Sequence, residues 1–307
     1  MTERAEETAT QRPTLGFIGL GAMGGHFARN LVRAGYRVLG FDLDEARLAA
    51  AAEGGVTPAA GLVAVLEGAG VVLTSLPSSQ AWIDLAREVL APRARAGQAF
   101  IDLGTVAPPD ARRVAGALAE RGALLLDAPL SGGPVGAERG ACYVFVGGQR
   151  EAFELLRPVL EVFGGGSGGG RLTYCGPSGS GQVAKGVNQL AMGLGAAAYL
   201  EAVMFGVNAG VAPEALAAAV GDASGWRAMV AGTAQRVAAG RGTEVGVKFR
   251  ELPYFLQEAR ERGFPLPLTE RLYAVCDEGE RVTVDDNRPA PSFYHQLALQ
   301  TESNALP

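Results

Sequence analysis

Short apolar runs alternate with amphipathic stretches over the first half of the chain. An apolar run bounded by turn residues predicts a buried strand, and an apolar repeat of about 3.6 residues predicts a helix. Alternation of the two predicts a mostly parallel sheet with helices on both faces. We expect strands at residues 15–18, 37–41, 71–76, 99–103 and 123–127, and two further strands of the same sheet at 142–146 and 172–174.

Strand patterns stop before Gly181, and only helical patterns follow. The first predicted helix, at 182–209, is rich in small apolar residues and is expected to be long, largely buried and placed between two domains. Shorter helices are predicted at 213–222, 226–239, 246–262 and 268–278. The domains that follow from this pattern are a polar tail at 1–13, a doubly wound α/β domain at 14–176 and an all-α domain at 177–307.

Composition agrees with two packed domains, because the 307 residues are 48% hydrophobic and 19% charged. No uninterrupted apolar run approaches the roughly 18 residues that span a bilayer, and residues 1–13 lack the apolar core of a signal peptide. The net charge is -5 and the arginines are dispersed, so neither nucleic acid nor a membrane is an expected partner. Three cysteines without CxxC spacing predict free thiols in a reducing cytoplasm. The glycine-rich run at 164–170 predicts a flexible surface loop.

A glycine-rich motif, Gly19-Leu20-Gly21-Ala22-Met23-Gly24, follows the first strand and begins the amphipathic segment 23–33. Strand, glycine turn and helix in this order are the fingerprint of a dinucleotide-binding Rossmann domain. Gly19 allows a tight turn, Gly21 lets a pyrophosphate approach the backbone, and Gly24 lets the helix pack against the strand. We expect the phosphates to lie at the positive end of the helix.

The acidic residue expected about 20 positions later is Asp42, at the end of the second strand. Its carboxylate can accept hydrogen bonds from the adenosine ribose hydroxyls and repels a 2'-phosphate, so NAD is favoured over NADP. Arg47 could reach such a phosphate if the loop turned differently. Asp42 could instead be a solvated loop charge, and Asp44 is expected to cap a helix.

Ligands of open parallel sheets bind at the carboxyl ends of the strands. Leu76-Pro77-Ser78 and Gly104-Thr105 stand at two such ends, which makes Leu76, Pro77 and Thr105 candidates for cofactor contact. In the alternative, Ser78 and Thr105 only satisfy backbone amides of a strand-to-helix turn.

Ser131, Gly132 and Gly133 follow the strand that ends at Asp127. A hydroxyl and several backbone amides can converge here on a carboxylate, so these residues are candidates for substrate binding. A plain turn is at least as good an interpretation of this segment alone.

Of 27 basic residues only Lys185 and Lys248 are lysines. A lysine can exchange a proton near neutral pH when it is buried, and an arginine cannot. Lys185, Asn188 and Gln189 are spaced so that one helix face presents all three among apolar residues. We favour a functional Lys185 over the commoner case of an exposed helix lysine.

Transfer of a hydride from an alcohol requires a group that takes the hydroxyl proton. His26 and His295 have no carboxylate or metal-ligand neighbour at a useful spacing, and the chain has no HExxH, paired-cysteine or GxSxG motif. We therefore expect no metal and a lysine acid/base. Its amine must titrate well below a free lysine, which burial can produce.

With these three motifs in order, residues 14 to about 280 resemble the beta-hydroxyacid dehydrogenase family, which includes 3-hydroxyisobutyrate dehydrogenases and tartronate semialdehyde reductases. The matching segments are 16–24, 127–133 and 181–189. The resemblance implies Lys185 as acid/base, Asn188 as a residue that orients the substrate, and Ser131 with the following amides as the carboxylate site. It also implies a helical domain that supplies dimer or tetramer contacts.

The chain departs from the family in the helical domain, where a Lys-Asp-Leu triplet usually closes over nicotinamide and substrate. Arg250-Glu251-Leu252 stands there instead, so we expect Arg250 to take the closing role. Lys248, two residues earlier, points to another side of a helix and is either a cofactor contact or a solvent-facing residue. Trp226 could line the pocket, but a packed core aromatic is the favoured interpretation.

The expected function is NAD-dependent interconversion of a small 3-hydroxy acid and its semialdehyde or keto form in the cytoplasm. An imine reductase of the same architecture is one alternative, although those relatives usually lack a lysine at position 185. A non-catalytic dinucleotide-binding module is the other.

Overall fold

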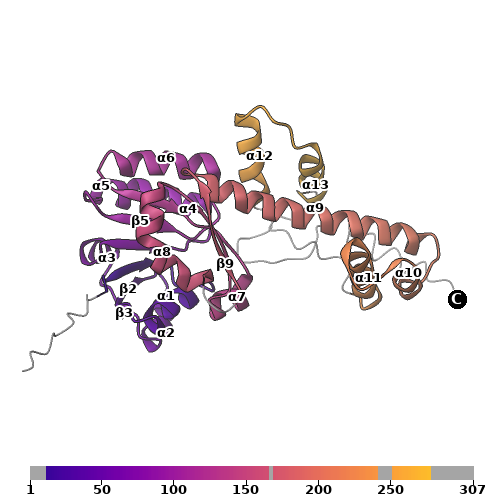
Figure 1. Ribbon diagram of the computed structural model, residues 1–307, viewed down its shortest axis with the longest axis horizontal. Helices are drawn as coiled ribbons and strands as arrows, with labels where there is room; N and C mark the ends of the chain where they lie inside the picture. The colour runs from indigo at the N-terminus through magenta and orange to yellow at the C-terminus, as the bar shows by residue number, and fades with distance from the viewer. Residues whose placement is uncertain (1–11, 166–168, 241–250, 278–307) are drawn as a thin grey trace, which may run out of the picture. The chain divides into compact units, whose positions relative to one another are not determined.

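The computed structural model describes residues 12–165, 169–240 and 251–277 (Figure 1). The chain divides into two compact units, of which the first ends at Lys185 and the second begins at Gly186.

The first unit is built on a single nine-stranded sheet in the order β3-β2-β1-β4-β5-β6-β8-β7, with β9 pairing to β8. Strand β8 is antiparallel to β6 and β7, and the other pairs are parallel. The strands are β1 Leu15–Ile18, β2 Val38–Phe41, β3 Thr57–Pro58, β4 Val71–Thr74, β5 Ala99–Asp102, β6 Leu124–Asp127, β7 Leu130–Ser131, β8 Tyr143–Gly147 and β9 Arg171–Gly176.

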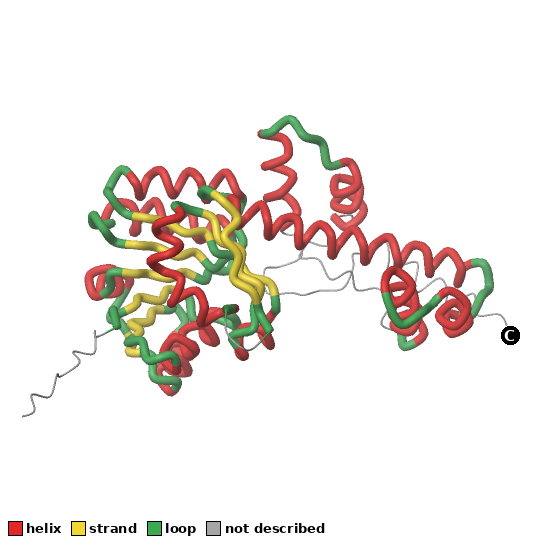
Figure 2. The backbone as a smooth tube through the Cα atoms, viewed as in Figure 1, coloured by secondary structure: helices red, strands yellow, loops and turns green. Residues whose placement is uncertain are grey.

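Helices cover both faces of this sheet (Figure 2). Alternate residues of a strand point to opposite faces, so Phe17 packs with Phe27 and Phe163 on one face while Ile18 packs with Trp82 on the other. The helical segments of this unit are α1 Gly24–Arg33, α2 Glu45–Glu53, α3 Leu62–Gly68, α4 Ser79–Leu85, the π-helical turn Ala86–Leu90, α5 Ala91–Arg93, α6 Pro108–Ala119, α7 Gly133–Arg139 and α8 Arg150–Gly164. The predicted doubly wound, mostly parallel sheet is confirmed.

Within its described residues the second unit is helical. Its core joins Leu200 and Met204 to Leu252 and Leu272. The helices are α9 Ser180–Asn208, which begins in the first unit, α10 Pro213–Val220, α11 Gly225–Ala238, α12 Leu252–Glu261 and α13 Pro267–Asp277.

Helix α9 corrects one expectation. By length and composition alone its 29 residues could span a bilayer, although polar residues such as Lys185 and Glu201 interrupt the apolar run, as the sequence predicted. Only 33% of its most apolar window is buried, so it is less buried than predicted. One such helix does not indicate a membrane, because the core helix of a soluble protein meets the same criteria.

Three further predictions were wrong. The short strands β3 and β7 were missed, because two residues are too few for a sequence pattern. The glycine run does not begin as a loop, because Gly164 is the buried last residue of α8 and a Cβ there would collide with the carbonyl oxygen of Cys142. Trp226 is not a core aromatic, since it is 54% exposed and the Arg227 guanidinium lies over its ring.

Candidate active site

The glycine-rich loop connects β1 to α1 and has little room for side chains at two positions. Gly19 has φ 90°, and a Cβ on it would collide with the carbonyl oxygen of Ser75. A Cβ on Gly24 would collide with the carbonyl oxygen of Gly19. Without side chains at these positions, the first turn of α1 can approach the carboxyl end of β1 closely, and Leu20 is buried.

Gly21 lies in a different environment. Among the described residues, only the Arg47 guanidinium comes within 4 Å of a Cβ position on Gly21, at 3.3 Å. Helix α1 has no acidic residue in its first turn. An open backbone, a helix N-terminus and a nearby guanidinium fit the pyrophosphate of a dinucleotide.

Asp42 follows β2 and is fixed by two backbone amides. Its Oδ2 accepts from the amide of Leu20 at 2.6 Å, and its Oδ1 accepts from the amide of Asp44 at 2.9 Å. Each carboxylate oxygen keeps a second lone pair, so the side chain can still accept from ribose hydroxyls. Asp44 caps α2 by accepting from the amides of Ala46 and Arg47, as predicted.

The turns after β4 and β5 lie at neighbouring strand ends. Leu76 and Thr105 are half-buried, and Pro77 is exposed. Ser78 caps α4 by accepting from the amide of Ala81 at 3.1 Å, which is the turn role that the sequence left open.

Below these turns lies a buried carboxyl group that the sequence analysis missed. Asp102 is 1% exposed, and burial raises its pKa to about 7. Its Oδ1 accepts from the Thr74 hydroxyl at 2.8 Å and from the amide of Gly104, while Oδ2 is buried without a partner among the described residues. Trp82 donates to the same Thr74 hydroxyl at 3.2 Å. The sequence signal that could have indicated this group is an aspartate at the last position of an otherwise apolar strand.

A second buried carboxylate, Asp127, holds the start of α9. It accepts from the amide of Gly179 at 2.7 Å and from the amide of Gln182 at 3.0 Å. A carboxylate at a helix N-terminus satisfies amides that have no partner within the helix. Burial raises the pKa of Asp127 to about 6, against the opposing effect of these hydrogen bonds. A Cβ on Gly181 would lie 2.8 Å from this carboxylate, so the approach requires glycine.

Lys185 comes next along α9 and reaches back to the end of the sheet. It is 6% exposed, and its Nζ donates to the carbonyl oxygen of Leu130 at 2.8 Å. Leu130 precedes the predicted carboxylate site, in which Ser131 ends β7, and Gly132 and Gly133 have φ of 148° and 60°. The structure therefore brings the Lys185 amine to the residue that directly precedes Ser131–Gly133, although the two segments are more than 50 positions apart in the sequence.

The thiol of Cys142 lies under this turn. A Cβ on Gly132 would lie 3.2 Å from its Sγ. Burial raises the pKa of Cys142 to about 11, while Lys185 acts in the opposite direction. The side chain is therefore a neutral thiol that packs below the site, and Cys175 is also a free thiol.

Asn188 and Gln189 belong to the second unit. Gln189 is buried and donates to Glu251 Oε2 at 2.5 Å, and Asn188 donates to Gln189 Oε1 at 3.4 Å. Glu251 is the middle residue of the triplet that replaces Lys-Asp-Leu. Arg250 and Lys248 lie outside the described residues.

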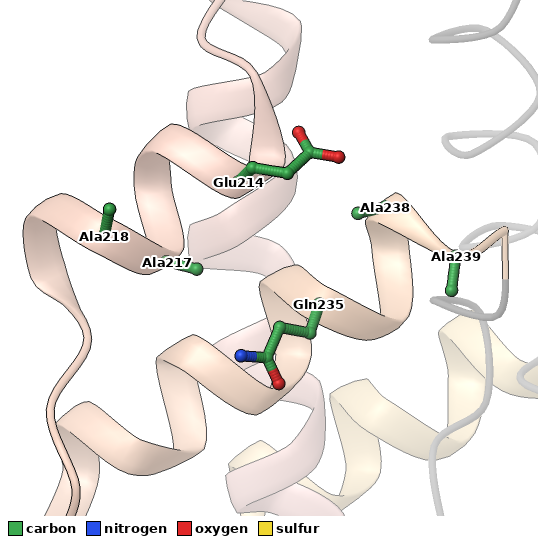
Figure 3. A pocket seen from close by; sticks show the side chains of 6 residues that line it. All are labelled: Glu214, Ala217, Ala218, Gln235, Ala238 and Ala239. Atoms are coloured by element: carbon green, nitrogen blue, oxygen red, sulfur yellow. The ribbon is translucent and has the colours of Figure 1, made fainter.

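The second unit also contains an open cavity of about 620 Å³ between α10 and α11 (Figure 3). None of the predicted site residues lines it. Its walls are Glu214, Ala217, Ala218, Gln235, Ala238 and Ala239.

Comparison with known proteins agrees with this geometry. Residues 14–176 match the NAD binding domain of 6-phosphogluconate dehydrogenase. Residues 179–287 match the NAD-binding region of NADP-dependent 3-hydroxyisobutyrate dehydrogenase.

Relatives and solved structures extend the match. The chain is 33% identical over 272 residues to 2-(hydroxymethyl)glutarate dehydrogenase of Eubacterium barkeri, covering 86% of this chain and 88% of that protein. It is 39% identical over 213 residues to 3-hydroxyisobutyrate dehydrogenase of Pseudomonas aeruginosa, covering 69% and 70%. The Mycobacterium tuberculosis 3-hydroxyisobutyrate dehydrogenase, solved with L-serine, aligns with a TM-score of 0.75 at 26% identity, over 96% of this chain and 99% of that one.

The glycine loop, the sheet order and these matches define an NAD(P)-dependent oxidoreductase. The chain belongs to the beta-hydroxyacid dehydrogenase family. An imine reductase from a Pseudomonas species aligns with a TM-score of 0.57 at 19% identity, which shows a shared fold.

Proposed function

We propose that the protein interconverts a small 3-hydroxy acid and its semialdehyde with NAD, and that Lys185 is the acid/base. The observation that carries this proposal is the buried Lys185 Nζ, held at Leu130 directly before the Ser131–Gly133 turn. A carboxylate bound at that turn would keep its hydroxyl-bearing carbon near the amine.

The reaction divides between these groups. In oxidation the neutral amine of Lys185 takes the hydroxyl proton, and in reduction the ammonium returns it to the carbonyl oxygen. To act as a base, the amine must be neutral when the hydroxyl proton is transferred. The Ser131 hydroxyl and the amides of Gly132 and Gly133 bind the substrate carboxylate. We assign Asn188 and Gln189 to orientation of the substrate and Arg250 to closure of the site.

The bound nicotinamide supplies the acceptor for the hydride. Gly19, Leu20, Gly21, Ala22, Met23 and Gly24 would hold the pyrophosphate, and Asp42 would hold the ribose. Leu76, Pro77 and Thr105 would line the strand ends, and Lys248 is a further candidate contact. We propose NAD over NADP because the Asp42 carboxylate, fixed by Leu20 and Asp44, opposes a 2'-phosphate. Arg47 beside Gly21 is the feature that could favour NADP.

The relatives support the substrate class. 3-Hydroxyisobutyrate, 2-(hydroxymethyl)glutarate and L-serine, the compounds in the relatives' names, all carry a hydroxymethyl group on the carbon next to a carboxylate. Such a substrate could bind its carboxylate at Ser131–Gly133 and present its hydroxyl group to the amine of Lys185.

We also propose a homodimer or homotetramer in the cytoplasm. Val187, Met192 and Phe205 of α9 are 64%, 47% and 78% exposed in a single chain, and we propose that contact with a second copy covers these apolar side chains. No nucleic acid or membrane partner is proposed.

A substrate panel tests the proposed function. Formation of NADH or NADPH is followed by absorbance with 3-hydroxyisobutyrate, 2-(hydroxymethyl)glutarate, L-serine, 3-hydroxypropionate and, as a positional control, lactate. We expect at least one 3-hydroxy acid to exceed lactate by about a hundredfold in kcat/KM, a difference of about 2.7 kcal/mol. Equal rates for lactate, or no turnover of any 3-hydroxy acid, would contradict the proposal.

A further inference from the structure

Gln182 lies in the first turn of α9 and connects that helix to the turn after β5, at Gly104–Val106. We call this turn, which contains the proposed cofactor contact Thr105, the cofactor-edge turn. It is fully buried. Its Oε1 accepts from the amide of Val106 at 3.1 Å, and its Nε2 donates to the carbonyl oxygen of Gly104 at 2.9 Å. One side chain thus satisfies two backbone groups of the turn that contains Thr105.

The backbone of Gln182 is bound to the end of a second strand. The Gln182 amide donates to the carboxylate of Asp127 at the end of β6. The side chain and the backbone of Gln182 therefore fix the first turn of α9 against the ends of β5 and β6 at once.

Lys185 is three residues further along α9, on nearly the same side of the helix as Gln182. If the first turn rotated or slid along its axis, the Lys185 amine would leave the carbonyl oxygen of Leu130. A displacement of about 1 Å in a reacting group can cost about a hundredfold in rate. The hydrogen bonds of Gln182 are thus suited to set the position of the amine.

We propose that Gln182 is a positioning residue, which holds the helix of Lys185 in register with the cofactor-edge turn at Gly104–Val106. The inference rests on the proposed function, because it assigns Gln182 a task in presenting the acid/base. It also predicts a physical effect on the Lys185 amine that needs no turnover to be seen.

Gln98 provides a matched control. It is 3% exposed, and its Nε2 donates to the carbonyl oxygens of Leu66 and Ala69 while its Oε1 accepts from the amide of Arg95. Like Gln182 it joins separate backbone segments, but at the opposite ends of the strands. Gln98→Met and Gln182→Met therefore remove similar buried hydrogen bonds, and only the second should affect Lys185.

The deciding measurement is the rate at which an amine-acylating reagent labels Lys185. The chain has only one other lysine, Lys248, so mass spectrometry of two peptides gives the ratio directly. We expect Gln182→Met to raise the labelling of Lys185 about fivefold or more, because Nζ loses its buried contact, and Gln98→Met to leave it near the wild-type rate. In turnover, kcat of Gln182→Met should fall about 10- to 100-fold.

Equal labelling of Lys185 in the two variants would overturn the proposal, whatever the turnover. A wild-type protein that oxidises no hydroxy acid would instead contradict the proposed function, and the labelling ratio would still decide the position of Lys185. If Gln182→Met does not fold, Gln182→Glu removes the donor to Gly104 while keeping its size. The same rise in labelling is then expected.

Discussion

The Nζ of Lys185 lies 2.8 Å from the carbonyl oxygen of Leu130, a residue 55 positions earlier in the chain. This contact joins the first turns of α9 to the short strand β7, where Ser131 and two glycines form the proposed carboxylate site. It places the candidate acid/base at the candidate substrate site within a single compact unit.

The carboxylate of Asp42 should set the choice of cofactor. Asp42→Asn keeps the size and an acceptor for the Leu20 amide but removes the charge that repels a 2'-phosphate. We expect the ratio of kcat/KM for NADP to that for NAD to rise about tenfold or more, or about 1.4 kcal/mol. Arg47→Gln is the paired variant and should move the ratio the other way. An unchanged ratio in Asp42→Asn would show that this carboxylate does not face the ribose.

Gly21 and Gly24 should respond differently to the same substitution. Gly24→Ala brings a Cβ onto the carbonyl oxygen of Gly19, so the free energy of unfolding should fall by about 2 kcal/mol or more. Gly21→Ala meets only the end of the flexible Arg47 side chain, so stability should change little while the Kd for NADH rises about tenfold. Denaturant unfolding and NADH titration measure the two effects. Loss of stability without loss of affinity in Gly21→Ala would contradict the assignment of this loop to the pyrophosphate.

Asp102 should make the protein less stable as the pH rises. Its pKa is about 7 in the folded chain and about 3.9 in an unfolded one, so between these values the folded state holds a proton that the unfolded state has lost. The stabilisation from this group is therefore present at low pH and is lost as the pH rises to about 7. The Asp127 carboxyl acts in the same direction over a narrower range.

Asp102→Asn isolates the contribution of Asp102. Relative to wild type, the variant should gain a few kcal/mol in the free energy of unfolding between about pH 4 and pH 8, measured with urea. Asp222→Asn, at an exposed position of the second unit, is the control and should show no such gain. A constant difference between Asp102→Asn and wild type across this range would mean that Asp102 is already ionised at low pH.

The sequence predicted the sheet, the glycine loop and the helical second half, because each depends on local periodicity or on glycine at fixed spacing. It did not predict the tasks of Asp127 and Gln182. Their partners, at Gly179 and at Gly104–Val106, come together only when β5, β6 and α9 have packed. The start of the glycine-rich loop was predicted wrongly for a related reason. Gly164 belongs to α8, and glycine is needed there because a Cβ would collide with the carbonyl oxygen of Cys142, a residue distant in sequence.

The central claim is that the Lys185 amine transfers the proton, and Lys185→Met tests it most directly. Oxidation of the best 3-hydroxy acid from the panel is measured by NADH formation, alongside the Kd for NADH. We predict that kcat falls by about a thousandfold or more, since general acid/base groups contribute about 10²- to 10⁴-fold, while the Kd for NADH changes by less than about threefold. Lys185→Arg, which keeps a charge that cannot be removed near neutral pH, should be equally inactive. Turnover by Lys185→Met within about tenfold of wild type would contradict the account.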